Sequence, residues 1–195
     1  MSQHIAQNKK LKTIAIVGGG SLANELKRIS TDDYLIDIIE HSNFDIASQQ
    51  QCDQLIPHLS TYNVVVITAG IHSGDAWSMW MTNTVGPCYV VSKLNELSTN
   101  QTIIAVTSHG ASWTSWPDIP ISRVIYNVNK LSLSEFCKGL IQQGTSTNKI
   151  TVFEPSKFQS RMSNNLGASI TDMAQTILDI VSSPLHLVHV VAKKT

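Results

Sequence analysis

The sequence predicts a doubly wound α/β domain, and three observations lead to that fold. Short apolar runs rich in β-branched residues alternate along the chain with longer segments of helical periodicity. These runs are apolar throughout, which is typical of strands in a parallel sheet that is covered on both faces. A glycine-rich turn separates the first run from the first helical segment. We therefore expect a mostly parallel sheet of about six to seven strands, with helices on both faces.

Each expected strand is short, apolar and rich in Val or Ile. The six expected strands are 13–17, 35–39, 64–68, 103–107, 150–153 and 187–191. The expected helices have apolar residues three or four positions apart. They are 21–29, 48–58, 76–97, 122–143 and 171–182, with Ser48 as the N-cap of the second. Residues 1–12 form a polar tail, so residues 13–195 are expected to form one domain.

The composition argues against several classes of function. Fourteen basic residues balance fourteen acidic ones, so no net charge attracts nucleic acid or an anionic membrane. No apolar run reaches the ~18 residues of a membrane-spanning helix. The polar start has no apolar signal core, so we expect a cytoplasmic protein. Cys52, Cys88 and Cys137 are widely spaced, which indicates reduced thiols, and no His or Cys pair has the spacing of metal ligands, so we expect no metal.

The turn after the first strand has a spacing that suits a dinucleotide. Gly18-Gly19-Gly20-Ser21-Leu22-Ala23 fits the pattern G-x-G-x-x-A. In that pattern Gly18 forms the turn, Gly20 lies beside the pyrophosphate, and Ala23 packs the helix on the strand. The N–H groups at the start of the helix would then face the anion. The sequence therefore predicts a dinucleotide site at this turn.

An acidic residue follows the second strand, about twenty residues after Gly18. A carboxylate there can bind both hydroxyls of the adenosine ribose and would repel a 2′-phosphate. Glu40 occupies this region and favours NAD over NADP. His41 and Lys27 are close in sequence and leave NADP open.

One helical segment brings a phenol and an ammonium together. Tyr126 and Lys130 are four residues apart within the amphipathic segment 122–143, so they share one face of the helix. A positive charge beside a phenol favours the phenolate, so we expect Lys130 to lower the pKa of Tyr126. The sequence therefore predicts a tyrosine that exchanges protons near neutral pH.

These segments resemble, in order, motifs of the short-chain dehydrogenase/reductase family over nearly all of residues 12–192. Tyr126 and Lys130 fall where the family's Tyr-x-x-x-Lys belongs, and Asn83 matches its helix asparagine. The other similar segments are the Asn-Asn-Ala-Gly strand at 65–70, the adenine-binding pair Asp45-Ile46, the serine strand 104–108 and the Pro-Gly strand 152–156. The resemblance implies a Rossmann-like fold and an NAD(P)-dependent oxidoreductase.

The chain departs from the family pattern at several points. Ala23 replaces the last glycine of the turn, Ile67-Thr68 replaces the two asparagines, and Ser156 stands where a glycine follows the proline. Few residues join the second strand to Asp45, so we expect the family's third strand and its preceding helix to be vestigial or missing. The segment from Pro155 to Thr171 is short, which predicts a small substrate lid.

The resemblance implies a role for each site residue. Tyr126 would exchange the proton, Ser108 would hydrogen-bond the reacting oxygen, Lys130 would bind the nicotinamide ribose, and Asn83 would hold a water that links Lys130 to solvent. Ser112 is the alternative serine. The implied dinucleotide contacts are Gly18, Gly20, Ser21, Leu22, Glu40, Asp45, Ile46, Ala69, Gly70, Tyr126, Lys130 and Pro155.

The substrate and the assembly follow from weaker observations. Trp113 and Trp116 follow the serine strand and could line a pocket for an apolar or aromatic substrate, whereas Trp77 and Trp80 suit a core or a helical interface at least as well. The resemblance implies that the substrate is a small alcohol or carbonyl compound. The resemblance implies a homodimer or homotetramer built on helices 76–97 and 122–143. Two other functions stay open, a non-catalytic dinucleotide sensor and an epimerase or dehydratase with tightly held NAD.

Overall fold

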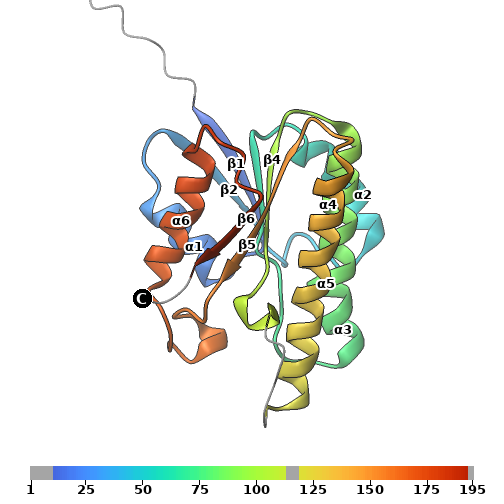
Figure 1. Ribbon diagram of the computed structural model, residues 1–195, viewed down its shortest axis with the longest axis vertical. Coiled ribbons are helices and arrows are strands. Elements are labelled where there is room, and N and C mark those ends of the chain that lie inside the picture. Colours follow the sequence, from blue (N-terminus) through green and yellow to red (C-terminus); the bar gives the residue numbers. More distant parts are fainter. Residues whose placement is uncertain (1–10, 113–118, 193–195) are drawn as a thin grey trace, which may run out of the picture.

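The central feature of the fold is a six-stranded sheet in which every pairing is parallel (Figure 1). The computed structural model describes residues 11–112 and 119–192. The strands are β1 (Lys12–Val17), β2 (Tyr34–Ile39), β3 (Val64–Ile67), β4 (Thr102–Val106), β5 (Lys149–Pro155) and β6 (His189–Ala192). They lie in the order β2-β1-β3-β4-β5-β6, with Ile14 of β1 opposite Ile36 of β2 and Val64 of β3. This confirms the predicted doubly wound α/β fold.

Helices cover both faces of this sheet. They are α1 (Ser21–Ile29), α2 (Gln49–Leu59), α3 (Ala76–Trp80), α4 (Gly86–Leu97), α5 (Ile121–Gln143) and α6 (Ile170–Ser182). Three shorter turns complete the structure, the π-helix η1 (Met81–Val85) and the 3₁₀ helices η2 (His109–Ser112) and η3 (Arg161–Ser163). Helices α1 and α6 lie on one face of the sheet, and α2 to α5 lie on the other (Figure 1). In the described part of the chain, no helix is both long and apolar enough to cross a membrane.

The direction in which the strands are added reverses between β1 and β3. Strand β2 lies on one side of β1, and the chain then returns through α2 to place β3 on the other side. Such a reversal leaves a crevice at the carboxyl ends of the two strands, where ligands bind in open α/β sheets. In the described residues β2 is an edge strand, and a loop leads from it to α2, so the third strand of the family pattern is missing, as the sequence predicts.

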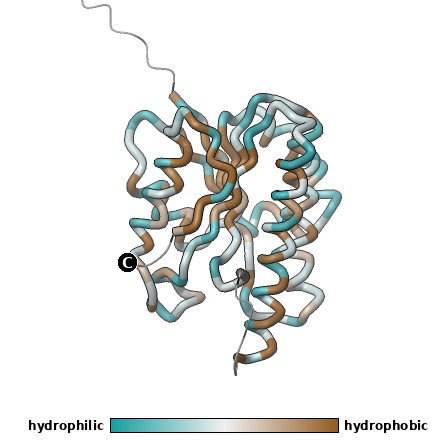
Figure 2. Tube along the Cα trace, viewed as in Figure 1, coloured by the Kyte–Doolittle hydropathy of each residue, from teal (hydrophilic) through white to brown (hydrophobic). Residues whose placement is uncertain are grey.

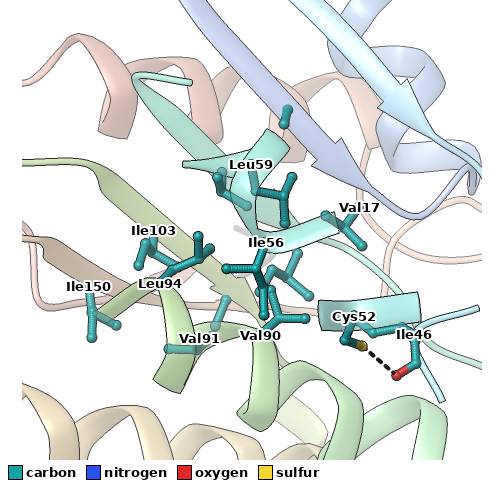
Figure 3. Close-up of a cluster of buried hydrophobic side chains, with 14 of the residues drawn as sticks. Val17, Ile46, Cys52, Ile56, Leu59, Val90, Val91, Leu94, Ile103 and Ile150 are labelled. Atoms are coloured by element: carbon teal, nitrogen blue, oxygen red, sulfur yellow. Dashed lines mark hydrogen bonds between the residues drawn. The ribbon is translucent and has the colours of Figure 1, made fainter. Parts of the chain in front are cut away.

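Two buried apolar clusters lie on the two faces of the sheet. Figure 2 shows that hydrophobic residues follow the central strands, which are buried from both sides. On one face, residues of β3 to β5 pack against α2 and α4, as with Ile103 against Leu94 in Figure 3. On the other face, Leu22 and Leu26 of α1 pack with Ile177 of α6.

The helix expected at residues 76–97 is interrupted by the π-helix η1. Pro87 has no N–H and cannot close an ordinary helical turn, and the N–H of Gly86 bonds instead to the carbonyl oxygen of Met81. A Cβ at Gly86 would lie 2.0 Å from the carbonyl oxygen of Ile46, so only glycine permits this contact. The wider turn therefore lets the helix pack closely on the loop that holds Ile46.

Candidate active site

A cavity of about 780 Å³ opens at the carboxyl ends of the strands, beside the reversal between β1 and β3. Its walls come from the glycine turn after β1, the loop before α2, the end of β3, the start of α3, and α5 with the end of β5. Its volume is in the range of pockets that bind cofactors and small molecules. The residues that the sequence assigns to the dinucleotide come largely from these segments.

Gly18 allows the glycine turn to lie against the end of β3. Its φ of +119° is in the region that favours glycine, and a Cβ there would lie 2.8 Å from the amide nitrogen of Ala69. Thr68 secures this contact, since its Oγ1 donates to the carbonyl oxygen of Gly18 over 3.0 Å. Thr68, noted in the sequence only as a departure from the family's asparagine, is therefore part of the turn's support.

The start of α1 forms a cradle for an anion. Gly20 is the N-cap and supplies no side-chain cap, so the first N–H groups of the helix keep no side-chain partner there. A Cβ at Gly20 would meet no atom within 4 Å, so the space in front of the helix is open. Ser21 and Leu22 line the cavity at this point. The arrangement fits a pyrophosphate, because backbone N–H groups and the helix dipole both favour an anion.

Asp45 and Ile46, which the sequence analysis assigns to the adenine, line the cavity. The Oδ1 of Asp45 accepts a hydrogen bond of 2.9 Å from the amide of Ala47, which fixes the carboxylate in the loop. Glu40 is exposed and does not belong to the cavity wall. Its side chain lies over the glycine turn, where its Cγ would be 2.9 Å from a Cβ on Gly19.

Lys130 is buried in the wall of the cavity, and its ammonium group is held by the backbone. Its Nζ donates hydrogen bonds of 3.1 Å to the carbonyl oxygens of Ala69 and Val106, at the ends of β3 and β4. Burial lowers the pKa of Lys130 to about 8. Gly70 leaves room for this group, since a Cβ there would lie 3.1 Å from Nζ.

Asn83 binds the backbone just beyond β3. It is fully buried in η1, its Oδ1 accepts a hydrogen bond from the amide of Ile71, and its Nδ2 donates one to the carbonyl oxygen of the same residue. The sequence interpretation gave Asn83 the role of holding a water beside Lys130. That role stays a prediction, and the two hydrogen bonds to Ile71 show in addition that the side chain holds the loop that follows Gly70.

Tyr126 lines the same cavity, as predicted, but its pKa is raised rather than lowered. Burial raises the pKa of Tyr126, because the phenolate loses its hydration, and the guanidinium of Arg123 opposes this increase. The hydrogen-bond partners of the Lys130 ammonium group are two carbonyl oxygens, those of Ala69 and Val106. Without a bound ligand, Tyr126 is therefore a weaker acid than the sequence suggested.

The remaining candidate residues fall outside the cavity wall or outside the described residues. Ser108 is half-buried just beyond β4, and it does not line the cavity. Its Oγ would lie 3.6 Å from a Cβ on Gly110. Ser112 ends η2, and Trp113 and Trp116 lie outside the described residues. Pro155 does line the cavity, as predicted.

Several cavity residues were not predicted to belong there. Trp77 is 71% exposed and lines the cavity, whereas Trp80 is half-buried and does not. Trp77 therefore contributes to the site, whereas the sequence analysis considers a place in the core or at a helical interface at least as suitable for it. Phe158 and Met162 line the cavity from the short segment before α6. The only sequence signal for them is their position after the strand that ends at Pro155.

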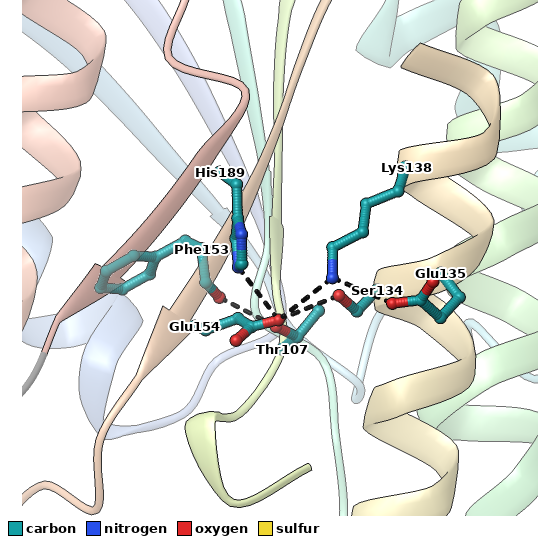
Figure 4. Close-up of polar contacts among 7 residues, drawn as sticks. All are labelled: Thr107, Ser134, Glu135, Lys138, Phe153, Glu154 and His189. Atoms are coloured by element: carbon teal, nitrogen blue, oxygen red, sulfur yellow. Dashed lines mark hydrogen bonds and ion pairs between the residues drawn. The ribbon is translucent and has the colours of Figure 1, made fainter. Parts of the chain in front are cut away.

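A buried carboxylate lies behind Pro155 and links three elements (Figure 4). Glu154 is 2% exposed, and its Oε1 accepts a hydrogen bond of 3.0 Å from the Oγ of Ser134. The same oxygen lies 3.1 Å from the Nε2 of His189 and 3.9 Å from the Nζ of Lys138. Ser134 and Lys138 continue the face of α5 that carries Lys130, so the cluster joins this helix to β5 and β6.

No group of three or more His, Cys, Asp or Glu in residues 11–112 and 119–192 could hold a metal ion. No protein-family model and no curated protein matches the chain by sequence. Solved structures match it by fold. BdcA in complex with NADPH is 13% identical with a TM-score of 0.75, and the match covers 96% of this chain and 98% of that one.

Two further structures have the same likeness. A dehydrogenase/reductase from Sinorhizobium meliloti is 16% identical, with a TM-score of 0.75 over 95% of each chain. A short chain dehydrogenase from Burkholderia cenocepacia in complex with NADP is 14% identical, with a TM-score of 0.71 over 94% of this chain and 89% of that one. The chain therefore has the Rossmann-like fold of the short-chain dehydrogenases and reductases.

Proposed function

We propose that this protein is an NAD(P)-dependent oxidoreductase of the short-chain dehydrogenase/reductase type that acts on a small alcohol or carbonyl compound. One observation carries the proposal: Tyr126 and Lys130 line the same cavity as the glycine turn and the uncapped start of α1. A proton donor and an anion cradle therefore share one space.

The residues of the cavity fit a dinucleotide. The N–H groups after Gly20 would bind the pyrophosphate, Asp45 and Ile46 would hold the adenine, and Lys130 would bind the nicotinamide ribose. The solved structures with NADP or NADPH support a nicotinamide dinucleotide. We propose NAD as the preferred form, because the carboxylate of Glu40 lies beside Gly19 and would repel a 2′-phosphate.

The chain itself would handle the proton and the charge. The nicotinamide of a bound dinucleotide supplies the hydride chemistry. Tyr126 would give its proton to the substrate oxygen in the direction of reduction and take it back in the direction of oxidation. Ser108 would donate a hydrogen bond to that oxygen, which requires its side chain to turn toward the cavity. Asn83 would keep the loop after β3 in place.

Binding and turnover test this proposal. Titration with NADH and with NADPH, followed by fluorescence, should give tighter binding of NADH. A panel of small aldehydes and ketones with the preferred reductant should then show loss of the reduced nicotinamide absorbance. Equal and weak binding of both dinucleotides would contradict the proposal. Glu40→Gln should narrow the preference for NADH, whereas Glu135→Gln, at a carboxylate of α5 that pairs with Lys138, should leave it unchanged.

A non-catalytic dinucleotide sensor is the second candidate. Ser108 lies outside the cavity wall, and burial raises the pKa of Tyr126, and both observations favour this candidate. A sensor would bind NADH without consuming it in the presence of any carbonyl compound of the panel.

We also propose that the protein is a homodimer or homotetramer through α4 and α5. Val85 and Val128 are each 38% exposed near the surfaces of these helices, and Ile121 is 73% exposed. Light scattering after size exclusion should give at least twice the monomer mass, and Val128→Glu should reduce it. A monomer at all concentrations would contradict this assembly.

A further inference from the structure

Arg123 lies against the ring of Tyr126 at the start of α5. The helix begins after Pro120, and Arg123 is its third residue, three positions before Tyr126. The two side chains therefore share one side of the helix. The guanidinium carbon of Arg123 is 5.7 Å from the centroid of the tyrosine ring, which is within the range of a cation–π contact.

The stability of α5 does not explain why a cation, Arg123, lies in its first turn. The start of a helix carries the positive end of its dipole, which favours acidic residues and disfavours cations. The first turn of α5 has no acidic residue, and Pro120 provides no side-chain cap. No carboxylate among the described residues lies within ion-pair distance of Arg123. Local conflicts of this kind are expected at functional sites.

Arg123 and Lys130 are the two cations of α5 near Tyr126. Burial lowers the pKa of Lys130 to about 8, so Lys130 loses its charge as the pH rises above that value. A guanidinium stays charged throughout. Burial raises the pKa of Tyr126, and Arg123 is the one described group that lowers this pKa.

The elements packed on α5 carry few other ionisable side chains. Strand β4 and the π-helix η1 have none in their sequences. The N-cap of α3 is Asp75, which binds Ser78, and η2 begins with His109. Glu154 of β5 faces α5 at Ser134, two turns beyond Tyr126. Helix α4 carries Cys88, whose pKa is raised by burial, and Tyr89, which bonds Asp53. It also carries Lys93 and Glu96, which pair with each other.

We propose that Arg123 is a positioning residue that stabilises the ionised form of Tyr126 during proton transfer. This inference rests on the proposed function. In reduction the O–H bond of Tyr126 breaks, the proton forms a new O–H bond on the substrate oxygen, and the electron pair stays on the phenolate. The guanidinium beside the ring stabilises that phenolate electrostatically. In oxidation the same phenolate accepts the proton from the alcohol.

The ionisation of Tyr126 can be measured without any substrate. The chain has only four tyrosines, so ¹⁹F NMR of protein labelled with 3,5-difluorotyrosine should give four resolved signals. Difluorotyrosine is more acidic than tyrosine, which brings the titration into a range where the protein stays folded. Tyr126→Phe identifies the signal of Tyr126. The variants are Arg123→Gln, Arg123→Lys, and Lys149→Gln, which removes one exposed charge at the far end of β5.

We expect the Tyr126 signal of Arg123→Gln to titrate at a pH roughly 0.5 higher than the same signal of the parent protein. Arg123→Lys should restore most of the difference, and Lys149→Gln should match the parent. Coincident curves for the parent and Arg123→Gln, or an equal shift in Lys149→Gln, would overturn the inference. A Tyr126 signal that does not titrate in the parent would also overturn it, because no ionised form would be available.

Turnover separates this inference from the proposed function. With a carbonyl compound found active in the panel, Tyr126 must be protonated, so the alkaline limb of kcat/KM in Arg123→Gln should move upward by the same amount as the NMR titration. An NMR shift without any turnover in the parent would contradict the oxidoreductase and leave the electrostatic role of Arg123 standing. Turnover with an unmoved pH profile would contradict the role of Arg123 alone.

Discussion

The side chain of Asn83 forms two hydrogen bonds of 2.7 Å with the backbone of Ile71, one to its N–H and one to its carbonyl oxygen. This pairing fixes the loop that leaves β3 beside the cavity. It depends on η1, the wider helical turn in which Asn83 lies. The shape of the site is therefore linked to an irregular turn of a helix behind it.

Asn83→Ala should destabilise the protein by about 2–3 kcal/mol and weaken dinucleotide binding. The substitution leaves the half-buried N–H and carbonyl of Ile71 without their side-chain partner, and each such loss is costly. Urea unfolding and NADH titration measure the two effects. Asn95→Ala is the matched control, since Asn95 is also buried but only its backbone oxygen accepts hydrogen bonds. Unchanged binding in Asn83→Ala would contradict the link between this pair and the site.

Tyr126→Phe should abolish turnover while NADH binds almost as tightly as in the parent protein. The ring and its packing remain, and only the exchangeable proton is lost. Tyr89→Phe is the control. It removes a hydroxyl of α4 that donates a hydrogen bond to Asp53 of α2 outside the cavity, so this variant should retain full activity. Steady-state kinetics measures both variants. An unchanged kcat in Tyr126→Phe would remove the acid–base role.

The titration of Lys130 should make the free energy of unfolding increase with pH between about 8 and 10.5. Burial lowers its pKa from 10.5 to about 8, so the unfolded chain binds more protons than the folded one over that interval. The cost of the buried charge is thus fully present below pH 8 and is relieved as Lys130 becomes neutral. Between pH 7 and 9 the gain should be roughly 1 kcal/mol.

Lys130→Met lacks this titration, so the difference in unfolding free energy between parent and variant gives the effect directly. Cys88 and Tyr126 act in the opposite sense above pH 9, because burial raises their pKa values. Both groups are present in both proteins and cancel in the difference. A difference that stays constant from pH 7 to 9 would contradict the lowered pKa of Lys130.

Gly86→Ala should unfold or strongly destabilise the protein, by about 3 kcal/mol or more. An added Cβ would lie 2.0 Å from the carbonyl oxygen of Ile46, and backbone cannot yield as a side chain can. Gly139→Ala is the matched control within α5, where an added Cβ meets no atom within 4 Å. That variant should be more stable than the parent by about 0.5–1 kcal/mol. Thermal melts of the two variants should therefore move in opposite directions.

Local patterns in the sequence predicted the secondary structure well. Helix α1 has the bounds expected for residues 21–29, and Ser48 caps α2 through its side chain as predicted. Periodicity and capping depend on neighbouring residues, so a single sequence contains them. The glycine turn, Asp45 and Lys130 were placed at the cavity for the same reason, since each belongs to a short motif.

Features that depend on distant residues could not be predicted in this way. The close approach of Gly86 to the carbonyl oxygen of Ile46, forty residues earlier in the chain, depends on how two distant segments pack. The pKa of Tyr126 depends on how deeply the folded chain buries it, which the spacing to Lys130 does not reveal. Trp77 and Trp80 have similar sequence surroundings, and only the direction of each side chain on the helix distinguishes them.

The packing of α1 on α6 has a consequence for synthesis on the ribosome. Leu22 and Leu26 of α1 are covered by a helix that begins at Ile170, and Glu25 of α1 accepts a hydrogen bond from Thr171. A nascent chain that ends before this helix leaves the apolar face of α1 in water. Since chains emerge from the amino end, the cradle at Gly20 gains its support only when the last fifth of the protein has been made. Truncated products should therefore fail to capture a dinucleotide even though they contain every residue of the glycine turn.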